Sequence, residues 1–270
     1  MWLSSFATPA ERFTRLLVVL FATAVLIFLI APIFIIVPLS FSSDPFFTFP
    51  VPHYSLRWYY DFFGNERWIN SIINSAVTAV FTTIFATVLG TMASLGLSKP
   101  DFPYRQAVMA LLISPMIVPI VIVAVGSYLF FGQLGLTNTR PGLVLAHTAL
   151  ATPFVVITVT ATLSTYDTNL TRAALSLGAP PLSAFFRVTL PNILPGIVSG
   201  AIFAFATSFD EVVVALFMTG AEQRTLPVQM FSGIRDQINP TIMAAATILL
   251  AISVCLFLLV ALVSGRKSSR

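Results

Sequence analysis

The amino-acid sequence predicts an all-α membrane protein with six transmembrane helices, for three reasons. Of its 270 residues, 57% are hydrophobic and only 9% are charged, whereas a soluble domain carries about 25% charged residues. The mean hydropathy is +0.93. Apolar stretches also recur that exceed the roughly 20 residues a helix needs to cross about 30 Å of hydrocarbon. They are continuous and do not alternate with polar residues, which excludes the strands of an outer-membrane barrel.

Six long apolar windows mark the predicted spans. In chain order they cover residues 16–39, 72–97, 107–131, 143–164, 193–219 and 242–264. The first apolar run is too long for the core of a signal peptide, and no small-residue cleavage site follows it. We therefore expect the first span to stay attached, so that residues 1–270 form a single transmembrane domain.

Basic residues are distributed unequally between alternate connections. One side carries nine Lys or Arg against three acids, a balance of +6, and the other carries five against five. Because positive charge favours the cytoplasmic side of a membrane, both termini are predicted to be cytoplasmic. The same asymmetry accounts for the net charge of +4, so the basic balance requires no nucleic-acid partner.

The first external connection, residues 40–70, combines an irregular segment with a short helix. Three prolines, Pro45, Pro50 and Pro52, exclude regular helix near its start. Residues 55–63 then read SLRWYYDFF, a pattern typical of an amphipathic helix at a membrane interface. We expect this helix to pack at the interface, with contact to an external partner as the alternative.

The fourth connection, residues 165–192 and hereafter the hook, predicts two short helices joined at a glycine corner. Asp167 or Thr168 can cap the first helix, and Gly178 ends it. Pro181 begins the second helix, which is expected to end before Pro191. Small and apolar residues would then protrude into the cytoplasm. Such a surface either contacts a partner or lies on the lipid headgroups.

Asp210 and Glu211 are the acids that fall inside a predicted span. An acid at bilayer depth costs about 2.5–3.5 kcal/mol, so some interaction must offset it. Adjacent helical positions point about 100° apart, so only one of the two can face a pore squarely. The pair either attracts a cation or forms a gate, or it lies hydrated near the outer mouth.

The same span also carries a close-packing face. Its small residues are spaced by four, at Gly196, Gly200, Ala204 and Ser208. A series of this kind lets another helix approach closely, either in a partner or within this chain.

Prolines and one histidine mark the third and fourth spans. Pro115, Pro119 and Pro153 predict kinks or hinges. His147 is expected to be an interface residue and not a ligand, because no second His or Cys lies at metal-ligand spacing beside it.

The sequence contains no recognisable catalytic constellation. No G-x-x-x-x-G-K-[ST] pattern surrounds Lys99 or Lys267, so the chain is not expected to hydrolyse nucleotide by itself. Cys255 is the single cysteine, which excludes a disulfide framework and a cysteine metal cage. An intramembrane aspartyl enzyme would need acids facing each other from two helices. We therefore predict a chain that is not an enzyme and binds no metal or cofactor of its own.

Several motifs occur in an order and spacing that resemble a known family. The pattern Arg172-Ala173-Ala174-x-x-x-Gly178, followed by Pro191, resembles the EAA loop of permease subunits of binding-protein-dependent ABC importers. Further segments resemble the second permease of the spermidine/putrescine type: SFDEVVV at 208–214, FMTG at 217–220, TLP at 225–227, NP at 239–240, AATIL at 245–249, Trp58-Tyr59 and Ser114-Pro115.

The resemblance implies a type I ABC importer permease fold in the bacterial inner membrane. It implies that this permease pairs with a second, related permease to enclose the solute path. A periplasmic binding protein would deliver the solute, and two ATPase subunits, which hold ATP and Mg, would supply the energy. The hook would be the coupling loop, formed by Leu170, Arg172, Ala173, Ala174, Leu177, Gly178, Ala179, Phe185 and Phe186. Arg172 stands where the loop usually has Glu.

The resemblance also implies a small polar or cationic solute, with polyamine as the leading candidate. The implied substrate path contains Asp210, Glu211, Phe209 and Met116. Met116 stands where the similar polyamine permeases carry Asp, so an opine, an amino acid or another amine stays open. The alternative functions are an ion-coupled secondary carrier and, from a different class, an intramembrane enzyme or a scaffold for membrane assembly.

Overall fold

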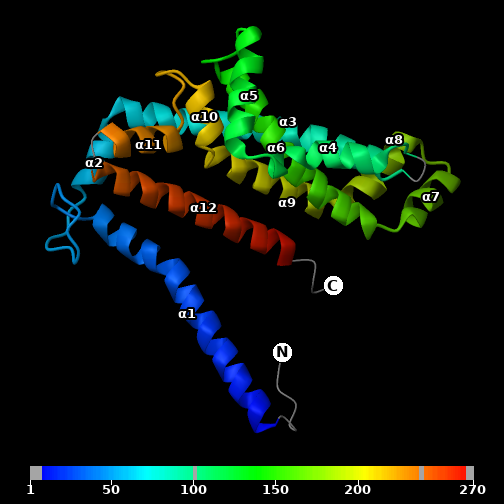
Figure 1. Cartoon of the computed structure of the whole chain (residues 1–270). Coiled ribbons are helices and arrows are strands. Elements are labelled where there is room, and N and C mark those ends of the chain that lie inside the picture. The colour runs from blue at the N-terminus through cyan, green and yellow to red at the C-terminus, as the bar shows by residue number, and fades with distance from the viewer. Residues whose placement is uncertain (1–7, 100–101, 237–239, 266–270) are drawn as a thin grey trace.

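The computed structural model describes residues 8–99, 102–236 and 240–265, and nearly all its regular structure is helical (Figure 1). The elements in chain order are α1 (Pro9–Ser40), α2 (Arg57–Gly64), α3 (Glu66–Leu97), α4 (Arg105–Ile117), α5 (Ile120–Gln133), α6 (Arg140–Ser164), α7 (Thr168–Ser176), α8 (Pro181–Ala184), the π-helix η1 (Phe185–Thr189), α9 (Leu190–Phe209), α10 (Val213–Met218), α11 (Leu226–Asp236) and α12 (Thr241–Gly265).

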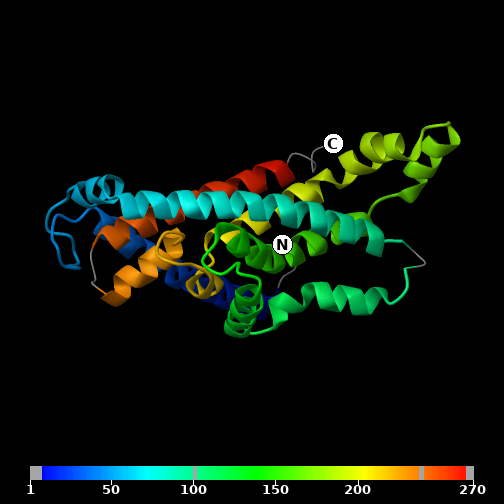
Figure 2. The same ribbon diagram turned by 90° about the horizontal axis from the view of Figure 1, so that it is seen from above.

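The core of the bundle consists of α3, α6 and α9, which pack side by side (Figure 2). Small residues make this close packing possible. A Cβ atom on Gly200 would lie 2.9 Å from Cα of Val155, and one on Gly90 would lie 2.7 Å from the Val155 Cβ. The face of small residues on the predicted fifth span therefore packs on α6 within this chain.

Two ends of the bundle can be defined from the arrangement of these helices. The hook, with α7 and α8, lies at one end, and α2 lies at the opposite end (Figure 1). Residues 219–225, between α10 and α11, bond to α3 near α2. We call the end that carries α2 and residues 219–225 the far end.

Among the described residues, four helices are long and apolar enough to cross a membrane: Phe13–Ser40, Glu66–Leu97, Arg140–Ser164 and Pro181–Phe209. A fifth is present if α4 and α5, which meet at a bend of 102°, are counted as one broken span. Thr241–Cys255 of α12 forms a shorter apolar helix at the predicted sixth span. The exact number of six spans therefore stays a prediction.

The predicted third span is broken at Pro119 and is not merely kinked. Val118, which precedes this proline, has extended backbone angles, φ −69° and ψ 135°. The residue before a proline is disfavoured in the α region, so α4 ends there and α5 starts in a new direction. Pro115 and Pro153 lie inside continuous helices.

The predicted fifth span is also interrupted. The helix that begins in the hook ends at Phe209, and α10 begins at Val213. Asp210 and Glu211 therefore lie in a short non-helical segment, residues 210–212, which we call the acidic break. The prediction had placed both acids on one continuous helix.

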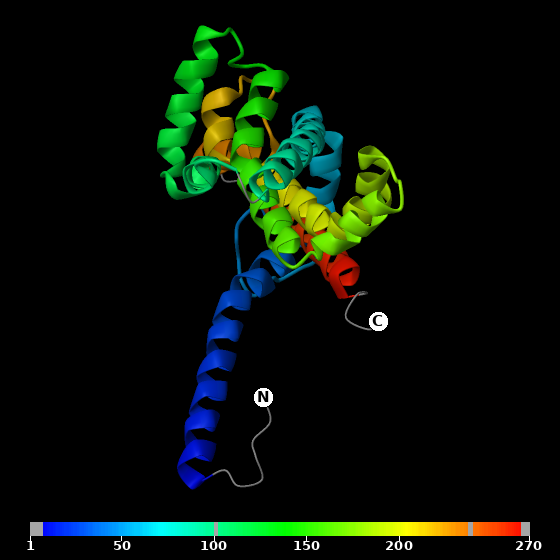
Figure 3. The ribbon, with the colours of Figure 1, turned by 90° about the vertical axis from the view of Figure 1, so that its right-hand side faces the viewer.

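The first helix extends away from the other helices, while α5 projects on the opposite side (Figures 1 and 3). None of the most apolar stretch of α1 is buried within this chain. The side chains of α1 and α5 therefore leave large apolar surfaces uncovered, among them Phe21 and Phe28 on α1 and Leu129 and Phe130 on α5.

Candidate functional site

The first α-helix of the hook has defined caps at both ends. The Asp167 side chain accepts a hydrogen bond of 2.9 Å from the Asn169 N–H at the start of α7. At the other end Gly178 has φ +86°, a left-handed conformation that favours glycine. The Gly178 N–H donates to the Leu175 carbonyl at 3.0 Å, and the Ala179 N–H donates to the Ala174 carbonyl at 3.1 Å. This pair of bonds is the Schellman pattern of a helix C-terminus.

The second helix of the hook differs from its prediction because it does not end before Pro191. It passes through the π-helix η1 directly into α9, and Pro181–Phe209 form one continuous apolar helix. The Leu190 N–H donates to the Phe185 carbonyl, five residues earlier. A proline ring normally clashes with the carbonyl four residues before it. The wider π register immediately before Pro191 accommodates the ring, so the helix continues.

Hydroxyl groups tie the two parts of the hook together. The hydroxyls of Tyr166 and Thr171 lie 2.6 Å apart, and those of Thr171 and Thr189 lie 3.0 Å apart. These contacts join α7 to η1, which leads directly into α9.

The predicted coupling residues are presented mainly on the outside of the hook. Leu177 is 88% exposed and Phe186 is 59% exposed. The exposed members of the predicted set are Leu170, Arg172, Ala173, Leu177, Gly178 and Phe186, whereas Ala174, Ala179 and Phe185 are half-buried.

The acidic break separates the two acids into different environments. Asp210 is exposed, and its carboxylate forms no ion pair among the described residues. Glu211 is only 8% exposed. Phe209 is 4% exposed and stacks on Phe205 with ring centroids 5.5 Å apart.

The fourth residue of the predicted substrate path, Met116, lies on another helix. It is 45% exposed in the last turn of α4, which packs on α6.

Backbone amides hold the Glu211 carboxylate. Oε1 accepts a hydrogen bond of 2.7 Å from the Val214 N–H, and Oε2 accepts one of 2.8 Å from the Ala215 N–H. These are unpaired amides of the first turn of α10, so Glu211 caps that short helix. Both carboxylate oxygens are therefore already bonded within this chain.

A buried histidine completes the cluster around Glu211. His147 on α6 is 1% exposed, its Nδ1 lies 2.9 Å from Ser208 Oγ, and its Nε2 lies 3.3 Å from Glu211 Oε2. The prediction that His147 is an interface residue is therefore wrong. No second His or Cys lies near His147 in the sequence, because its partners are a serine and a glutamate about sixty residues away.

The acidic break lies near the middle of the bundle. Thr82, halfway along α3, donates to the Val144 carbonyl at 3.4 Å. Val144 precedes His147 by about one helical turn, so His147 and its partners lie at this level. Asp210, the residue that follows the last turn of α9, therefore lies well inside the length of the bundle.

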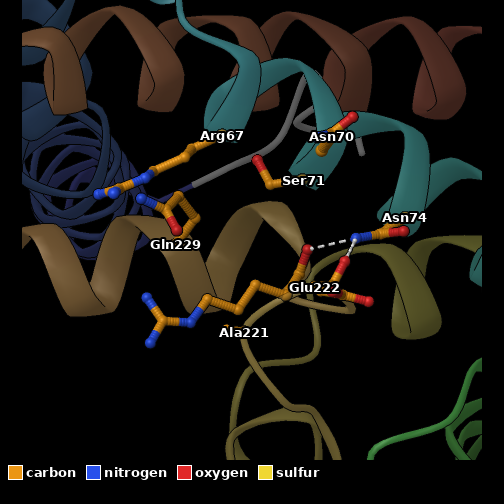
Figure 4. A pocket seen from close by; sticks show the side chains of 8 residues that line it. Arg67, Asn70, Ser71, Asn74, Ala221, Glu222 and Gln229 are labelled. Carbon is orange, nitrogen blue, oxygen red and sulfur yellow. Dashed lines mark hydrogen bonds between the residues drawn. The ribbon is translucent and has the colours of Figure 1, made fainter.

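A polar cavity lies at the far end (Figure 4). Its volume is about 410 Å³, and it is lined by Arg67, Asn70, Ser71, Asn74, Ala221, Glu222, Arg224 and Gln229. Arg67 and Arg224 form no ion pair among the described residues. No local sequence pattern indicates this cavity, because its walls come from α3 and from a segment about 150 residues later.

Two adjacent residues of α3 fix the position of residues 219–225. The Asn74 Nδ2 donates to the carbonyl oxygens of Glu222 at 2.8 Å and Arg224 at 3.1 Å. Ser75 Oγ accepts a bond of 2.8 Å from the Leu226 N–H at the start of α11. The far-end segment is thereby held against the core helix α3.

The described part of the chain contains no group of three His, Cys, Asp or Glu side chains that could hold a metal ion. Its polar clusters are the acidic break with His147 and the far-end cavity; in the first, the Ser208 hydroxyl lies beside the His147 ring, but Ser208, His147 and Glu211 are all buried. These arrangements suit binding and positioning.

Comparison with known sequences identifies relatives over most of the chain. Residues 86–269 match the family described as binding-protein-dependent transport system inner membrane component. The spermidine/putrescine transport system permease protein PotC of Haemophilus influenzae is 31% identical over 248 residues, 92% of this chain and 96% of PotC. The putrescine transport system permease protein PotI of Escherichia coli K12 is 31% identical over 230 residues, covering 83% of this chain and 82% of PotI.

The fold also matches a solved structure. A chain of a bacterial ABC transporter involved in the import of the acidic polysaccharide alginate superposes with a TM-score of 0.74 at 18% identity. The match covers 98% of this chain and 99% of that chain. At 18% identity, this similarity shows a shared fold and no more.

Proposed function

The chain belongs to the family of binding-protein-dependent transport system inner membrane components, and we propose that it forms half of an importer pore for polyamines. As a permease of an ABC importer it is a transport subunit, and the chemistry of ATP belongs to other subunits. Beyond the family, we propose the partners of this permease, its orientation in the membrane and its solute. A separate feature of the structure supports each of these.

The hook is the proposed docking element for the ATPase. Its capped corner at Gly178 holds two helices at a fixed angle, and Leu177 and Leu182 project outward at 88% and 73% exposure. Apolar side chains on a rigid protrusion favour insertion into a cleft of a partner. Because α8 and η1 continue into α9, movement of the hook would reach the acidic break. Arg172 is exposed on the hook, so we expect it to pair with an acidic side chain on the ATPase surface.

Asp210 is the proposed solute-facing acid. Its exposed carboxylate lies near the middle of the bundle, where contact with lipid would cost about 2.5–3.5 kcal/mol. Facing a hydrated path between two permeases removes that cost. Glu211 points inward and caps α10, so we assign it a structural role.

A second permease would cover the apolar surfaces that this chain leaves open. The most apolar stretch of α1 has none of its residues buried, and α5 exposes Leu129 and Phe130 by about 60%. Surfaces of this extent mark contact with protein or lipid. Because α5 packs on α10, which follows the acidic break, a permease paired along α5 would also lie near Asp210.

The far-end cavity is the proposed contact for the binding protein. Arg67 and Arg224 present two unpaired guanidinium groups beside the exposed Glu222. Arginine binds carboxylates in a two-pronged geometry, so acidic side chains on the binding protein are the expected partners. Two positive groups would repel a polycation, which makes this cavity unsuited to the solute itself.

Polyamine is the solute that the observations support best. PotC and PotI, each 31% identical to this chain, are named for spermidine/putrescine and putrescine transport. The free carboxylate of Asp210 supplies an acceptor for an ammonium group, and a cation near a carboxylate in a partly dehydrated path is strongly attracted.

Uptake into proteoliposomes tests the proposed solute. The complete importer, with its binding protein, both permeases and the ATPase, is reconstituted with ATP inside, and labelled putrescine is added outside. We expect ATP-dependent uptake that spermidine inhibits and that amino acids and opines do not. Asp210→Asn should raise the KM about tenfold, the effect expected when one hydrogen bond to a charged group is lost.

Asp61→Asn is the matched control, because Asp61 is an exposed acid that lies outside the lining of the far-end cavity and pairs with the exposed Arg57 at 3.9 Å. It should leave uptake unchanged. Uptake of an amino acid or opine in place of putrescine would refute the solute class. A wild-type KM in Asp210→Asn would remove Asp210 from the path.

A further inference from the structure

We propose that His147 is a positioning residue for the substrate path, which fixes the acidic break so that Asp210 is presented to the solute. The proposal builds on the proposed function, because it takes Asp210 as the acid that faces the path. His147 itself is 1% exposed and does not touch the solute.

The key observation is that His147 contacts the residues on both sides of Asp210. Its Nδ1 lies 2.9 Å from Ser208 Oγ, two residues before Asp210. Its Nε2 lies 3.3 Å from Glu211 Oε2, one residue after Asp210. One ring therefore spans the point where α9 ends and the break begins.

The chemistry of the three groups fixes the proton between His147 and Glu211. The Glu211 carboxylate only accepts hydrogen bonds, so His147 Nε2 carries the proton that faces it. Nδ1 and the Ser208 hydroxyl, 2.9 Å apart, share a hydrogen bond in which either group can be the donor. With the two amides from α10, both Glu211 oxygens and the Ser208 hydroxyl have hydrogen-bond partners, while His147 Nε2 approaches Glu211 Oε2 at 3.3 Å without hydrogen-bond geometry. Buried polar contacts of this kind restrict the positions that the segment carrying them can take.

The break depends on this anchor because its own backbone offers little restraint. Asp210 N–H still donates to the Ala206 carbonyl at 3.1 Å, but regular helix does not resume until Val213. His147 belongs to α6, which packs along both α3 and α9 in the core of the bundle. The His147 ring thus attaches the acidic break, which carries Asp210, to a tightly packed core helix.

Loss of the anchor predicts a particular kinetic signature. The variant still has the Asp210 carboxylate, but this group is no longer held in one position. Binding of the solute therefore weakens. In the complete importer, His147→Ala should raise the KM for putrescine on the order of tenfold with a smaller change in the maximal rate. His147→Gln keeps a donor for Glu211 and should recover part of the loss, while Ser208→Ala, which removes one of the two contacts, should have an intermediate effect.

A combined variant separates positioning from packing. If His147 acts through Asp210, then His147→Ala added to Asp210→Asn should raise the KM no further than Asp210→Asn alone. Thr148→Val is the control, since Thr148 is the buried neighbour on α6 whose hydroxyl bonds only to the Val144 carbonyl of its own helix. It should keep the wild-type KM.

A second readout needs no transport. In a Cys255→Ser background, Asp210→Cys provides one thiol, whose reaction with a water-soluble maleimide is timed in the purified complex. His147→Ala and Ser208→Ala should each change the labelling rate several-fold, and Thr148→Val should not. If the wild-type importer does not move putrescine, the proposed solute fails while this measurement still tests the anchor.

The proposal is overturned if the KM and the labelling rate stay at wild-type values in His147→Ala, or if the effects of His147→Ala and Asp210→Asn on KM multiply as independent changes. Should His147→Ala fail to assemble, His147→Gln and Ser208→Ala decide by the same two criteria. A wild-type KM and labelling rate in both would equally overturn it.

Discussion

At the scale of single residues, glycines determine how closely the core helices approach. Gly90 on α3 and Gly200 on α9 both lie against α6, and a side chain at either would meet Val155. In a membrane protein such close contacts replace the hydrophobic drive that packs soluble cores. Gly200 therefore stabilises the fold because its lack of a side chain lets α6 pack closely against α9.

Replacing Gly200 by Ala should destabilise the permease. The added Cβ would lie 2.5 Å from Thr158 Oγ1 and 2.9 Å from Val155 Cα, so the helices must separate. We expect a loss of about 1–3 kcal/mol, as for an overpacked core, which outweighs the roughly 1 kcal/mol that alanine gains over glycine in a helix. Thermal unfolding of the purified protein in detergent measures the change.

Gly126→Ala on α5 is the matched control, because a Cβ there has no neighbour within 4 Å. It should be neutral or slightly stabilising. Equal melting temperatures for Gly200→Ala and Gly126→Ala would contradict the packing that we describe.

Residue types in the sequence predicted some of these roles and missed others. The series Gly196, Gly200, Ala204 and Ser208 was visible as a close-packing face, since its spacing is local. The pairing of His147 with Glu211 was not visible, because it joins residues 64 positions apart through tertiary packing. For the same reason the sequence could not decide which of the two acids is exposed.

At the scale of elements, the hook owes its shape to one glycine. Gly178 takes φ +86° at the corner between α7 and α8, where other residues are strained. No atom lies within 4 Å of a Cβ built there, so the constraint is one of backbone conformation and not of space.

Gly178→Val should lower both uptake and solute-stimulated ATP hydrolysis without preventing insertion. A β-branched residue resists the left-handed conformation, so the corner opens and the exposed Leu177 is misplaced. Gly178→Asn should be milder, because asparagine tolerates that conformation. We expect solute-stimulated ATPase activity and uptake to fall together in Gly178→Val, and less so in Gly178→Asn.

Gly64→Val, at the last residue of α2, provides the comparison, since a Cβ there is also free of contacts and its φ is not positive. Wild-type coupling in Gly178→Val would show that the hook does not require this corner.

Helix type and approximate position followed from the apolar windows, but the breaks did not. The interruption at Pro119 could be anticipated as a kink, though its 102° bend depends on the packing of α5 against α10. The interruption after Phe209 contains no Pro or Gly within residues 210–212 and arises because Glu211 caps a new helix. At Pro191 a break was predicted, but the helix continues, because the π-helix before this proline accommodates its ring.

At the scale of the whole molecule, the chain separates three tasks along its length. The hook lies at the end opposite α2 (Figure 1). The polar cavity lies at the far end, and Asp210 lies between the two ends. A continuous helix runs from the hook to the acidic break. Composition predicted the membrane location, and the distribution of basic residues predicted which end faces the cytoplasm.

Cross-linking from the two ends tests this separation most directly. A photoreactive side chain is placed in the assembled importer, in intact cells, at Leu177 on the hook or at Glu222 beside the far-end cavity, both of which are exposed. Phe28, 77% exposed on α1, serves as the control position.

We expect position 177 to cross-link to the ATPase and position 222 to the binding protein, while position 28 reacts with neither soluble partner. Cross-linking of position 177 to the binding protein, or of position 222 to the ATPase, would contradict both the orientation and the coupling role of the hook.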